Sequence, residues 1–286
     1  MIYWYTKQTC IIRWGDCTSD PFYVSNGVRQ GGVLSPYLFN LYIDDLSTDL
    51  NSCDKGCCIN NVSINHLFYA DDSILIAPSA SGLQCLIDIC QSYANGHDII
   101  FNPKKSVYMC ILPSLLKHLR VPCVYINDSP IRLVNNHKYL GMRFTDTCVD
   151  DLEISAQLRN LYARGNALVR NFSHCTTDVK QQLFRTYCYN FYCIQLWCSF
   201  KKASLKRLRV AFNNIFRNLF NIKGIISISK ELILHGLDHF NVIHRKLIVS
   251  FIDRITVCDN DLAQAIVNSD FYCDSKLYTF WCATIY

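Results

Sequence analysis

Two adjacent carboxylates, Asp71 and Asp72, lie between two short apolar runs. The first run ends at Ala70, and the second begins after Ser73. This layout predicts a β-hairpin over residues 66–77 with the two acids at its tip. A tight turn can bring both acids to one side, where their oxygens suit a hard cation such as Mg²⁺. An ordinary exposed turn is the alternative, because aspartate is also a favoured turn residue.

The second half of the chain contains a long stretch of one charge sign. Between Val179 and Lys230 there are ten Lys and Arg residues and no Asp or Glu. A field of one sign over this length favours a polyanionic partner. A solvated helix face is the alternative.

Composition limits the class of protein. The 286 residues are 50% hydrophobic with a net charge of +5, enough for one large domain or two modest ones. The seventeen cysteines lack zinc-site spacing and predict reduced, buried thiols. There is no secretory signal pattern, and the longest apolar candidate, residues 189–200, is shorter than a membrane span. We therefore expect an intracellular protein, nuclear or cytoplasmic, that is not secreted and has no membrane partner.

Hydrophobic patterning predicts strands and helices in the first half and helices in the second. Residues 1–26 and 123–144 look strand-rich, residues 107–112 read as one strand, and residues 27–35 form a glycine-rich loop. Beyond Asp150 the pattern is helical almost throughout. The fold class is therefore α+β at the front and all-α at the back.

Three helices are expected to have one apolar face each. The first begins at Ser35-Pro36, with Ser35 as the N-cap. The acid pair Asp44-Asp45 falls within it or at its end and has a surface or packing role. The expected apolar faces are Leu38, Leu41, Tyr42 and Leu46; then Leu83, Leu86, Ile87, Cys90 and Ala94; then Leu205, Leu208, Phe212, Ile215, Phe216 and Leu219.

Four segments in a fixed order carry a family resemblance. They are GVRQGGVLSPYLFN at 27–40, YADD at 69–72, NPKKS at 102–106 and YLG at 139–141. Together they resemble the palm of reverse transcriptases, and the first is most similar to non-LTR (LINE-type) retrotransposons. The resemblance covers roughly residues 10–145. An RNA-templated RNA polymerase is the weaker alternative, because those enzymes usually have Gly rather than Ala before the acid pair.

The resemblance implies RNA-directed DNA polymerase activity, with an RNA template, a DNA primer and deoxynucleotide triphosphates as partners. Two Mg²⁺ or Mn²⁺ ions would stabilise the attacking and leaving oxygens. Asp71 is then a metal ligand, and Asp72 is its neighbour in a ligand or supporting role. Tyr69 is expected close to the primer terminus.

Other site residues are implied in the same way. Gln30 and Gly31 would meet the incoming nucleotide, where glycine allows close backbone approach, and Arg29 would meet a phosphate. Lys105 would protonate or neutralise the leaving pyrophosphate, although composition alone makes Lys104 an equal contender. The primer-gripping hairpin would be Tyr139, Leu140 and Gly141.

The basic helical region resembles the family's thumb. Its expected nucleic-acid contacts are Lys201, Lys202, Lys206, Arg207 and Arg209, through phosphates. The implied architecture is a partial right-hand polymerase palm over residues 1–148, followed by an all-α thumb and C-terminal helical region over residues 149–286.

One family segment has no counterpart here, so we expect an N-terminally truncated protein. The fingers and the strand carrying the first catalytic Asp normally lie well upstream of the glycine-rich loop. Only 26 residues precede Gly27. We therefore expect a missing upstream segment or a longer polyprotein, and little catalysis by this chain alone. The alternatives are a non-catalytic nucleic-acid-binding remnant of a retrotransposon and a decayed reading frame.

Overall fold

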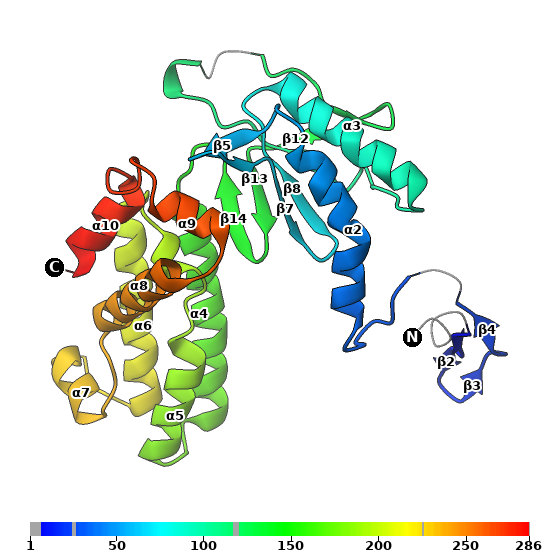
Figure 1. Ribbon diagram of the computed structural model, residues 1–286. Helices are drawn as coiled ribbons and strands as arrows, with labels where there is room; N and C mark the ends of the chain where they lie inside the picture. The colour runs from blue at the N-terminus through cyan, green and yellow to red at the C-terminus, as the bar shows by residue number, and fades with distance from the viewer. Residues whose placement is uncertain (1–6, 25–26, 117–119, 225, 286) are drawn as a thin grey trace. The chain divides into compact units, whose positions relative to one another are not determined.

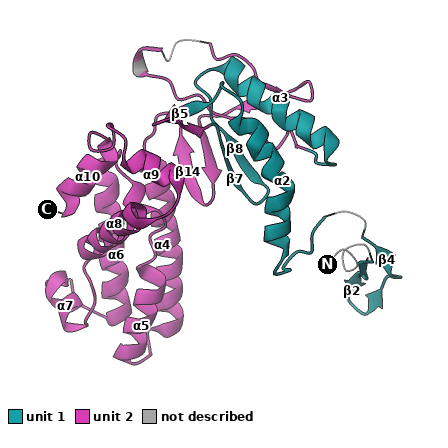
Figure 2. Ribbon diagram, in the orientation of Figure 1, with its two compact units in different colours: residues 1–57, 65–100 teal, residues 58–64, 101–286 magenta. Residues whose placement is uncertain are grey.

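A computed structural model describes residues 7–24, 27–116, 120–224 and 226–285 (Figure 1). The chain forms two compact units, which are described separately. Unit 1 is residues 1–57 and 65–100, and unit 2 is residues 58–64 and 101–286 (Figure 2). The domain boundary that we expect at residue 148 stays a prediction, because these units follow packing and not family boundaries.

Unit 1 combines short strands with two helices. The strands are β1 (Thr9–Cys10), β2 (Arg13–Trp14), β3 (Cys17–Thr18), β4 (Phe22–Tyr23), β7 (His66–Tyr69) and β8 (Asp72–Leu75), and the helices are α2 (Ser35–Asn51) and α3 (Ala80–Gly96). Antiparallel pairs join β1 to β4, β2 to β3, and β7 to β8. The strand-rich start is confirmed for its described residues.

The core of unit 1 lies between α2 and α3. Leu46 and Leu50 of α2 are buried, as are Leu86, Ile87 and Cys90 of α3. The α3 face therefore follows the predicted helical period. Its start is also locally encoded, because the Ser79 side chain accepts the Gly82 N–H at 3.1 Å as an N-cap.

The start of α2 differs from the prediction in two ways. Ser35 is the first helical residue and not the N-cap, and its hydroxyl donates to the Arg29 carbonyl at 2.5 Å. The predicted apolar face is also wrong at Leu41 and Tyr42, which are 71% and 46% exposed. The buried apolar residues of α2 are Leu46 and Leu50, so periodicity alone placed the face too early.

Unit 2 begins with short strands. They are β9 (Val107–Tyr108), β10 (Tyr125–Ile126), β11 (Ser129–Pro130), β12 (Arg132–Leu133), β13 (Asn136–Tyr139) and β14 (Met142–Thr145), preceded by the β5 (Cys57–Ile59) and β6 (Val62–Ile64) pair that crosses the unit boundary. The strand expected over residues 107–112 is shorter, and it pairs in parallel with β12. Every sheet in the described part of the chain has two strands.

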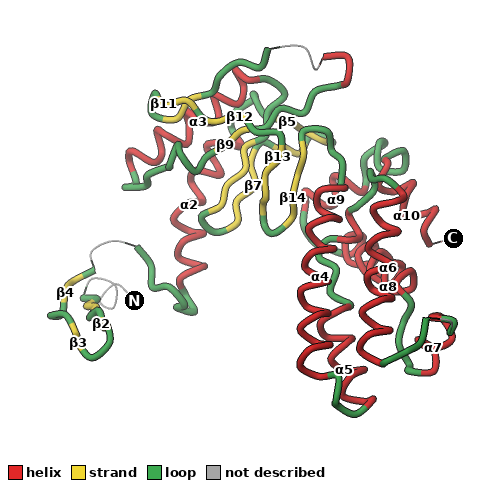
Figure 3. Tube along the Cα trace, turned by 180° about the vertical axis from the view of Figure 1, so that it is seen from behind, coloured by secondary structure: helices red, strands yellow, loops and turns green. Residues whose placement is uncertain are grey.

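Helices follow from Asp151 to the end of the described chain, as predicted (Figure 3). They are α4 (Asp151–Phe172), α5 (Thr177–Cys188), α6 (Lys202–Phe220), α7 (Ile228–Leu234), α8 (Phe240–Val257), α9 (Asp261–Val267) and α10 (Lys276–Ile285). A 3₁₀ turn at Ile194–Leu196 lies between α5 and α6, and another at Ser114–Leu116 lies earlier, between β9 and β10. The predicted α6 face is confirmed: Leu208, Phe212, Ile215, Phe216 and Leu219 are buried, and Leu205 packs against the same core.

Helices α4 and α6 lie side by side and approach closely at Gly165. A Cβ built on Gly165 would lie 2.4 Å from the Ile215 Cδ1 atom. Glycine is therefore required there, because an extra methyl group would have to displace a side chain from a packed interior. The sequence offered no signal for this contact, since the two residues are far apart in the chain.

A buried histidine makes the stability of unit 2 depend on pH. His244 is 4% exposed, its Nε2 has no partner among the described residues, and its ring lies 6.0 Å from that of Phe280. Burial lowers the pKa of His244 to about 4. The unfolded chain, with a His pKa near 6.5, therefore binds more protons than the folded chain between these two pH values.

We expect the free energy of unfolding to fall as the pH drops from about 6.5 towards 4. The His244 contribution should be ~2 kcal/mol at pH 5 relative to pH 7. Urea unfolding at both pH values measures it, and His244→Leu should lose this part of the pH dependence. His137, which is exposed, provides the control substitution His137→Asn. Equal pH dependence in the parent and His244→Leu chains would contradict the prediction.

Candidate active site

The two acids lie at the tip of the predicted hairpin, which the structure confirms. Strands β7 and β8 pair antiparallel, with Tyr69 opposite Asp72 and a loop of Ala70 and Asp71 between them. Ala70 has a φ of 52°, the sign that primed hairpin turns require at the first loop position. Asp71 and Asp72 are exposed, and Tyr69 is 64% exposed. All three side chains are thus accessible to a substrate.

The base of this hairpin is anchored on α2 by residues that sequence reasoning missed. The buried Asn65 side chain donates to the Leu50 carbonyl, and the Asn65 backbone carbonyl accepts the Ile76 N–H at 2.8 Å. His66 bonds the Ser47 hydroxyl at 2.7 Å and the Asn65 side chain at 2.7 Å. Burial lowers the pKa of His66. These bonds hold the hairpin alongside α2 and so fix the direction of its tip.

The glycine-rich loop leads directly into α2. The Gly32 N–H donates to the Arg29 carbonyl at 3.0 Å, and Gly31 has a φ of 79°, which favours glycine. Arg29, Gln30 and Gly31 are exposed. Within unit 1 the hairpin tip points towards the N-terminal end of α2 and hence towards this loop (Figures 1 and 3). That the acids and the predicted nucleotide-binding residues meet in one site stays a prediction.

The two carboxylates of the acid pair are the kind of ligand that a hard cation prefers, but they are only two. Carboxylate oxygens are the ligands that Mg²⁺ prefers, usually together with waters and substrate phosphates. Within the described residues, no group of three or more His, Cys, Asp or Glu side chains could hold a metal ion. The metal-ligand role of Asp71 and Asp72 therefore stays a prediction.

The lysine turn belongs to unit 2. Asn102 organises it, because its side-chain oxygen accepts the Lys104 N–H at 3.0 Å and its carbonyl accepts the Lys105 N–H at 3.1 Å. Both lysines are exposed. The turn therefore presents two equivalent cations, and the choice of Lys105 over Lys104 stays a prediction.

The hairpin of Tyr139, Leu140 and Gly141 is present and is held at its tip. Strands β13 and β14 pair with Tyr139 opposite Met142, and both loop residues have positive φ, as a type I′ turn requires. The Tyr192 hydroxyl donates to the Leu140 carbonyl at 2.5 Å. A Cβ on Gly141 would lie 3.1 Å from the Tyr192 ring. Tyr192 is a second residue that sequence reasoning missed.

The β13–β14 hairpin is also hydrogen-bonded to α4, the first helix of the helical region. Glu153 of α4 is 2% exposed and accepts the Arg143 backbone N–H at 3.0 Å. The same carboxylate accepts the Gln157 side chain at 2.8 Å. A buried carboxylate with two donors therefore couples β14 to α4, so the loop tip is carried on a helix and not on a free strand.

The predicted nucleic-acid contacts gather at the start of α6. Lys201, Lys202, Lys206 and Arg207 are exposed, whereas Arg209 is half-buried. The Asp151 carboxylate of α4 accepts the Lys201 backbone N–H at 3.2 Å and also the Ser204 hydroxyl. This fixes the start of α6 while leaving the four exposed cations for a partner.

Arg217, further along α6, has a structural role instead. Its guanidinium donates to the Lys223 carbonyl at 2.9 Å and to the Ile226 carbonyl at 2.7 Å. Both carbonyls belong to the segment that follows α6, so Arg217 holds that segment against the last turn of the helix. The guanidinium of Arg217 is therefore engaged within the chain, whereas the cations at the start of α6 are exposed.

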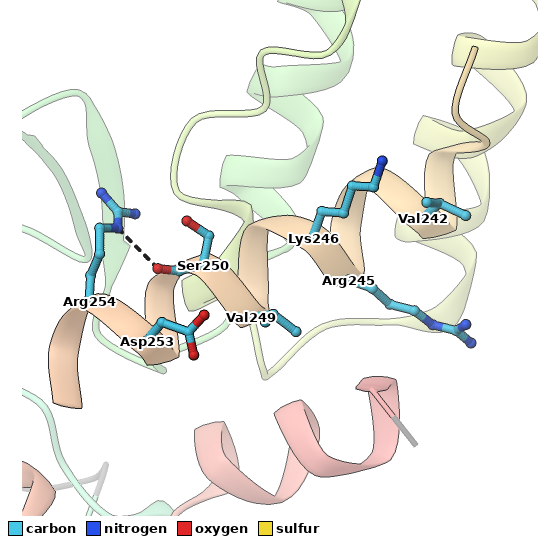
Figure 4. Close-up of a pocket in the computed structure, with 7 residues that line it drawn as sticks. All are labelled: Val242, Arg245, Lys246, Val249, Ser250, Asp253 and Arg254. Atoms are coloured by element: carbon cyan, nitrogen blue, oxygen red, sulfur yellow. Dashed lines mark hydrogen bonds between the residues drawn. The ribbon is translucent and has the colours of Figure 1, made fainter. Parts of the chain in front are cut away.

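A shallow, open surface pocket of about 510 Å³ lies along α8 (Figure 4). It is lined by Val242, Arg245, Lys246, Val249, Ser250, Asp253 and Arg254. Its cations are largely engaged: Lys246 pairs with Asp238 at 2.7 Å, and the Arg254 guanidinium donates to the Ser250 carbonyl at 3.1 Å. None of the predicted site residues lines it, so it carries no part of the candidate site.

The comparisons with known proteins agree with the motif order. The model of the family described as reverse transcriptase (RNA-dependent DNA polymerase) matches residues 2–144. This range contains both loop hairpins, the glycine-rich loop and the lysine turn. Among the described residues, no helix has the length and apolar character needed to cross a membrane.

Three relatives come from mobile elements of insects. A Pol polyprotein of the type-1 retrotransposable element R2 of Popillia japonica is 29% identical over 51% of this chain and 26% of the relative. The Pol polyprotein of the type-2 retrotransposable element R2DM of Drosophila melanogaster is 31% identical over 46% of this chain and 13% of the relative. The RNA-directed DNA polymerase of the Drosophila melanogaster element jockey is 23% identical over 86% of this chain and 28% of the relative. The chain thus spans little more than a quarter of these relatives at most.

Proposed function

Because the chain belongs to the reverse transcriptase (RNA-dependent DNA polymerase) family, we propose that it is the later palm and the thumb of an RNA-directed DNA polymerase of a non-LTR retrotransposon. The observation that carries the proposal is the exposed Asp71–Asp72 hairpin, anchored within unit 1 and inside the matched range. Its partners would be an RNA template, a DNA primer and deoxynucleotide triphosphates. It would work inside the cell, in the nucleus or cytoplasm.

The proposed reaction is template-directed nucleotidyl transfer. The primer 3′-oxygen attacks the α-phosphate of the nucleotide, and pyrophosphate leaves. Divalent ions, when bound, would supply positive charge to the phosphate oxygens. The chain's own residues would position the reactants: Asp71 and Asp72 as ligands, Gln30, Gly31 and Arg29 at the nucleotide, and Tyr69 at the primer terminus. Lys105 would donate a proton to the pyrophosphate.

The incomplete ligand set supports a further part of the proposal. With two adjacent carboxylates and no third acidic ligand among the described residues, the chain alone is expected to extend primers poorly. A segment from elsewhere in a longer polyprotein would supply the missing ligand. The test joins the region preceding the matched part of the Popillia R2 relative to this chain. Primer extension by the fusion and not by the chain alone would support the proposal; inactivity of both would contradict it.

A second candidate function, nucleic-acid binding without catalysis, is favoured by the α6 cations. Four of them are exposed at a helix start fixed by Asp151. Each phosphate contact that is removed should make the dependence of log affinity on log salt shallower by about one. We expect Lys201→Gln, Lys202→Gln and Arg207→Gln together to reduce this slope by about three, measured by titration of an RNA–DNA hybrid.

The control for this measurement is Lys246→Gln. Its ammonium pairs with Asp238 at 2.7 Å, so its charge is already compensated and the slope should stay the same. Binding that needs no added metal, in a chain that fails to extend primer even as the fusion, would favour this second function. An unchanged slope in the triple variant would exclude the α6 surface from either function.

A further inference from the structure

Two cysteine thiols meet where α2 ends against α3. The Cys53 and Cys85 Sγ atoms are 3.9 Å apart, although the residues are separated by 32 positions in the chain. Cys53 follows the last turn of α2, and its N–H donates to the Leu50 carbonyl at 3.1 Å. Cys85 lies within α3. The two thiols are therefore presented by defined backbone and not by a free loop.

The segment that carries Cys53 packs closely on α3. A Cβ built on Gly82, one turn before Cys85, would lie 2.8 Å from the Lys55 carbonyl. A disulfide needs its sulfur atoms about 2.0 Å apart, so the two Sγ atoms, which are 3.9 Å apart, have to move closer for the bond to form.

Both thiols of the pair are accessible to a small reagent, because both are partly exposed. The hydrogen bond to Cys53 raises the pKa of Cys85, and the ammonium of Lys55 lies near both thiols. Either sulfur can be the donor of the bond between them, so the pair does not fix which sulfur reacts first.

Cys90, on the same helix, shows the contrast. It is 6% exposed, and burial raises its pKa to about 12. A thiol of this kind is inert, because the thiolate is the reactive form. The two cysteines of α3 thus differ in exposure, which makes Cys90 a matched internal reference.

We propose that Cys53 and Cys85 are a redox-responsive thiol pair that closes to a disulfide on exposure to a hydroperoxide. The thiolate of one cysteine of the pair attacks the peroxide, taking one oxygen to form a sulfenic acid and releasing an alcohol or water. The sulfur of the other cysteine then attacks the sulfenic sulfur, forming the S–S bond, and the sulfenic oxygen leaves as water with the thiol proton. Two electrons pass from the thiols to the peroxide. A cellular dithiol reverses the reaction by thiol–disulfide exchange.

The closed bond would brace unit 1. It would join the end of α2 to α3, whose packing forms the core of the unit, while Asn65 and His66 hold the hairpin on α2. A cross-link over this separation restricts the unfolded chain and so stabilises the folded unit. Oxidation of the two thiols does not require polymerase activity.

The test treats the full chain with hydrogen peroxide at stoichiometric amounts, then blocks free thiols and maps disulfide-linked peptides by mass spectrometry. We expect the Cys53–Cys85 peptide as the first disulfide, reversed by dithiothreitol. Alkylation of Cys90 in the untreated chain should be at least about tenfold slower than that of Cys53. Oxidised chain should also show slower hydrogen exchange in residues 35–96.

Three variants make the result specific. Cys53→Ser and Cys85→Ser should each abolish the linked peptide and the change in hydrogen exchange, whereas Cys90→Ser should retain both. The mapping of the unsubstituted chain stands without them if a variant fails to fold. A first disulfide that joins Cys53 to Cys57, or that involves only other cysteines, would overturn the proposal. So would Cys53 and Cys85 remaining open to alkylation after other thiols have oxidised.

Discussion

Replacing Asp71 with asparagine in the fusion described above is expected to lower the primer-extension rate about 1000-fold. A metal ion contributes several kcal/mol by stabilising charge in the transition state, and ~4 kcal/mol corresponds to this factor. Asparagine preserves the side chain's size but removes the negative charge that is proposed to hold the cation. Steady-state extension of a DNA primer on an RNA template, titrated with Mg²⁺ and with Mn²⁺, measures the effect.

The matched control is Asp44→Asn. Asp44 belongs to an exposed acid pair on α2, in the same unit as Asp71, so the control removes the same charge from a surface. Its extension rate should stay within about twofold of the parent. If Asp71→Asn kept full activity while thermal unfolding showed an intact fold, the hairpin would not be the metal-binding part of the site.

Replacing Phe212 with alanine should remove ~3–5 kcal/mol from the free energy of unfolding of the helical region. Phe212 is 0% exposed, and its ring lies 5.0 Å from that of Phe184 and 6.0 Å from that of Phe240. The cavity would therefore open between α5, α6 and α8 at once, where no single helix can close it. Urea unfolding followed by far-UV circular dichroism provides the measurement.

Phe271→Ala is the corresponding surface control, because Phe271 is 82% exposed. Its free energy of unfolding should change by less than ~0.5 kcal/mol. Equal effects of the two substitutions would mean that Phe212 is not part of a packed core. A loss of stability seen only for Phe212 would support a packed core shared by α5, α6 and α8.

Locally encoded features could be predicted from the sequence. The acid hairpin follows from apolar runs on either side of a turn, and the α3 and α6 faces follow from helical spacing. In each case neighbouring residues determine the result. The failures have the opposite cause: whether Leu41 is buried depends on what packs against α2, and whether Ser35 caps the helix depends on the Arg29 carbonyl.

The supports of the site could not be predicted in this way. The Asn65 side chain donates a hydrogen bond to Leu50, which belongs to another element. Tyr192 bonds Leu140 from 52 positions away. Such partners are chosen by tertiary packing and leave no periodic signal in the chain. The motif residues could be found in the sequence because each motif is a short local pattern. The choice between Lys104 and Lys105 could not be made, because it depends on where a bound substrate would lie.

The pairing of the strands has a consequence for the order of folding. Each antiparallel pair in the described chain joins segments close in sequence, and the parallel β9–β12 pair spans only 25 positions. Hairpins of this kind form on a microsecond timescale, whereas contacts between distant segments are slower. The docking of α6 onto α4 at Gly165 should therefore be slower than the formation of any hairpin, and substitutions there should change the refolding rate more than substitutions in any hairpin.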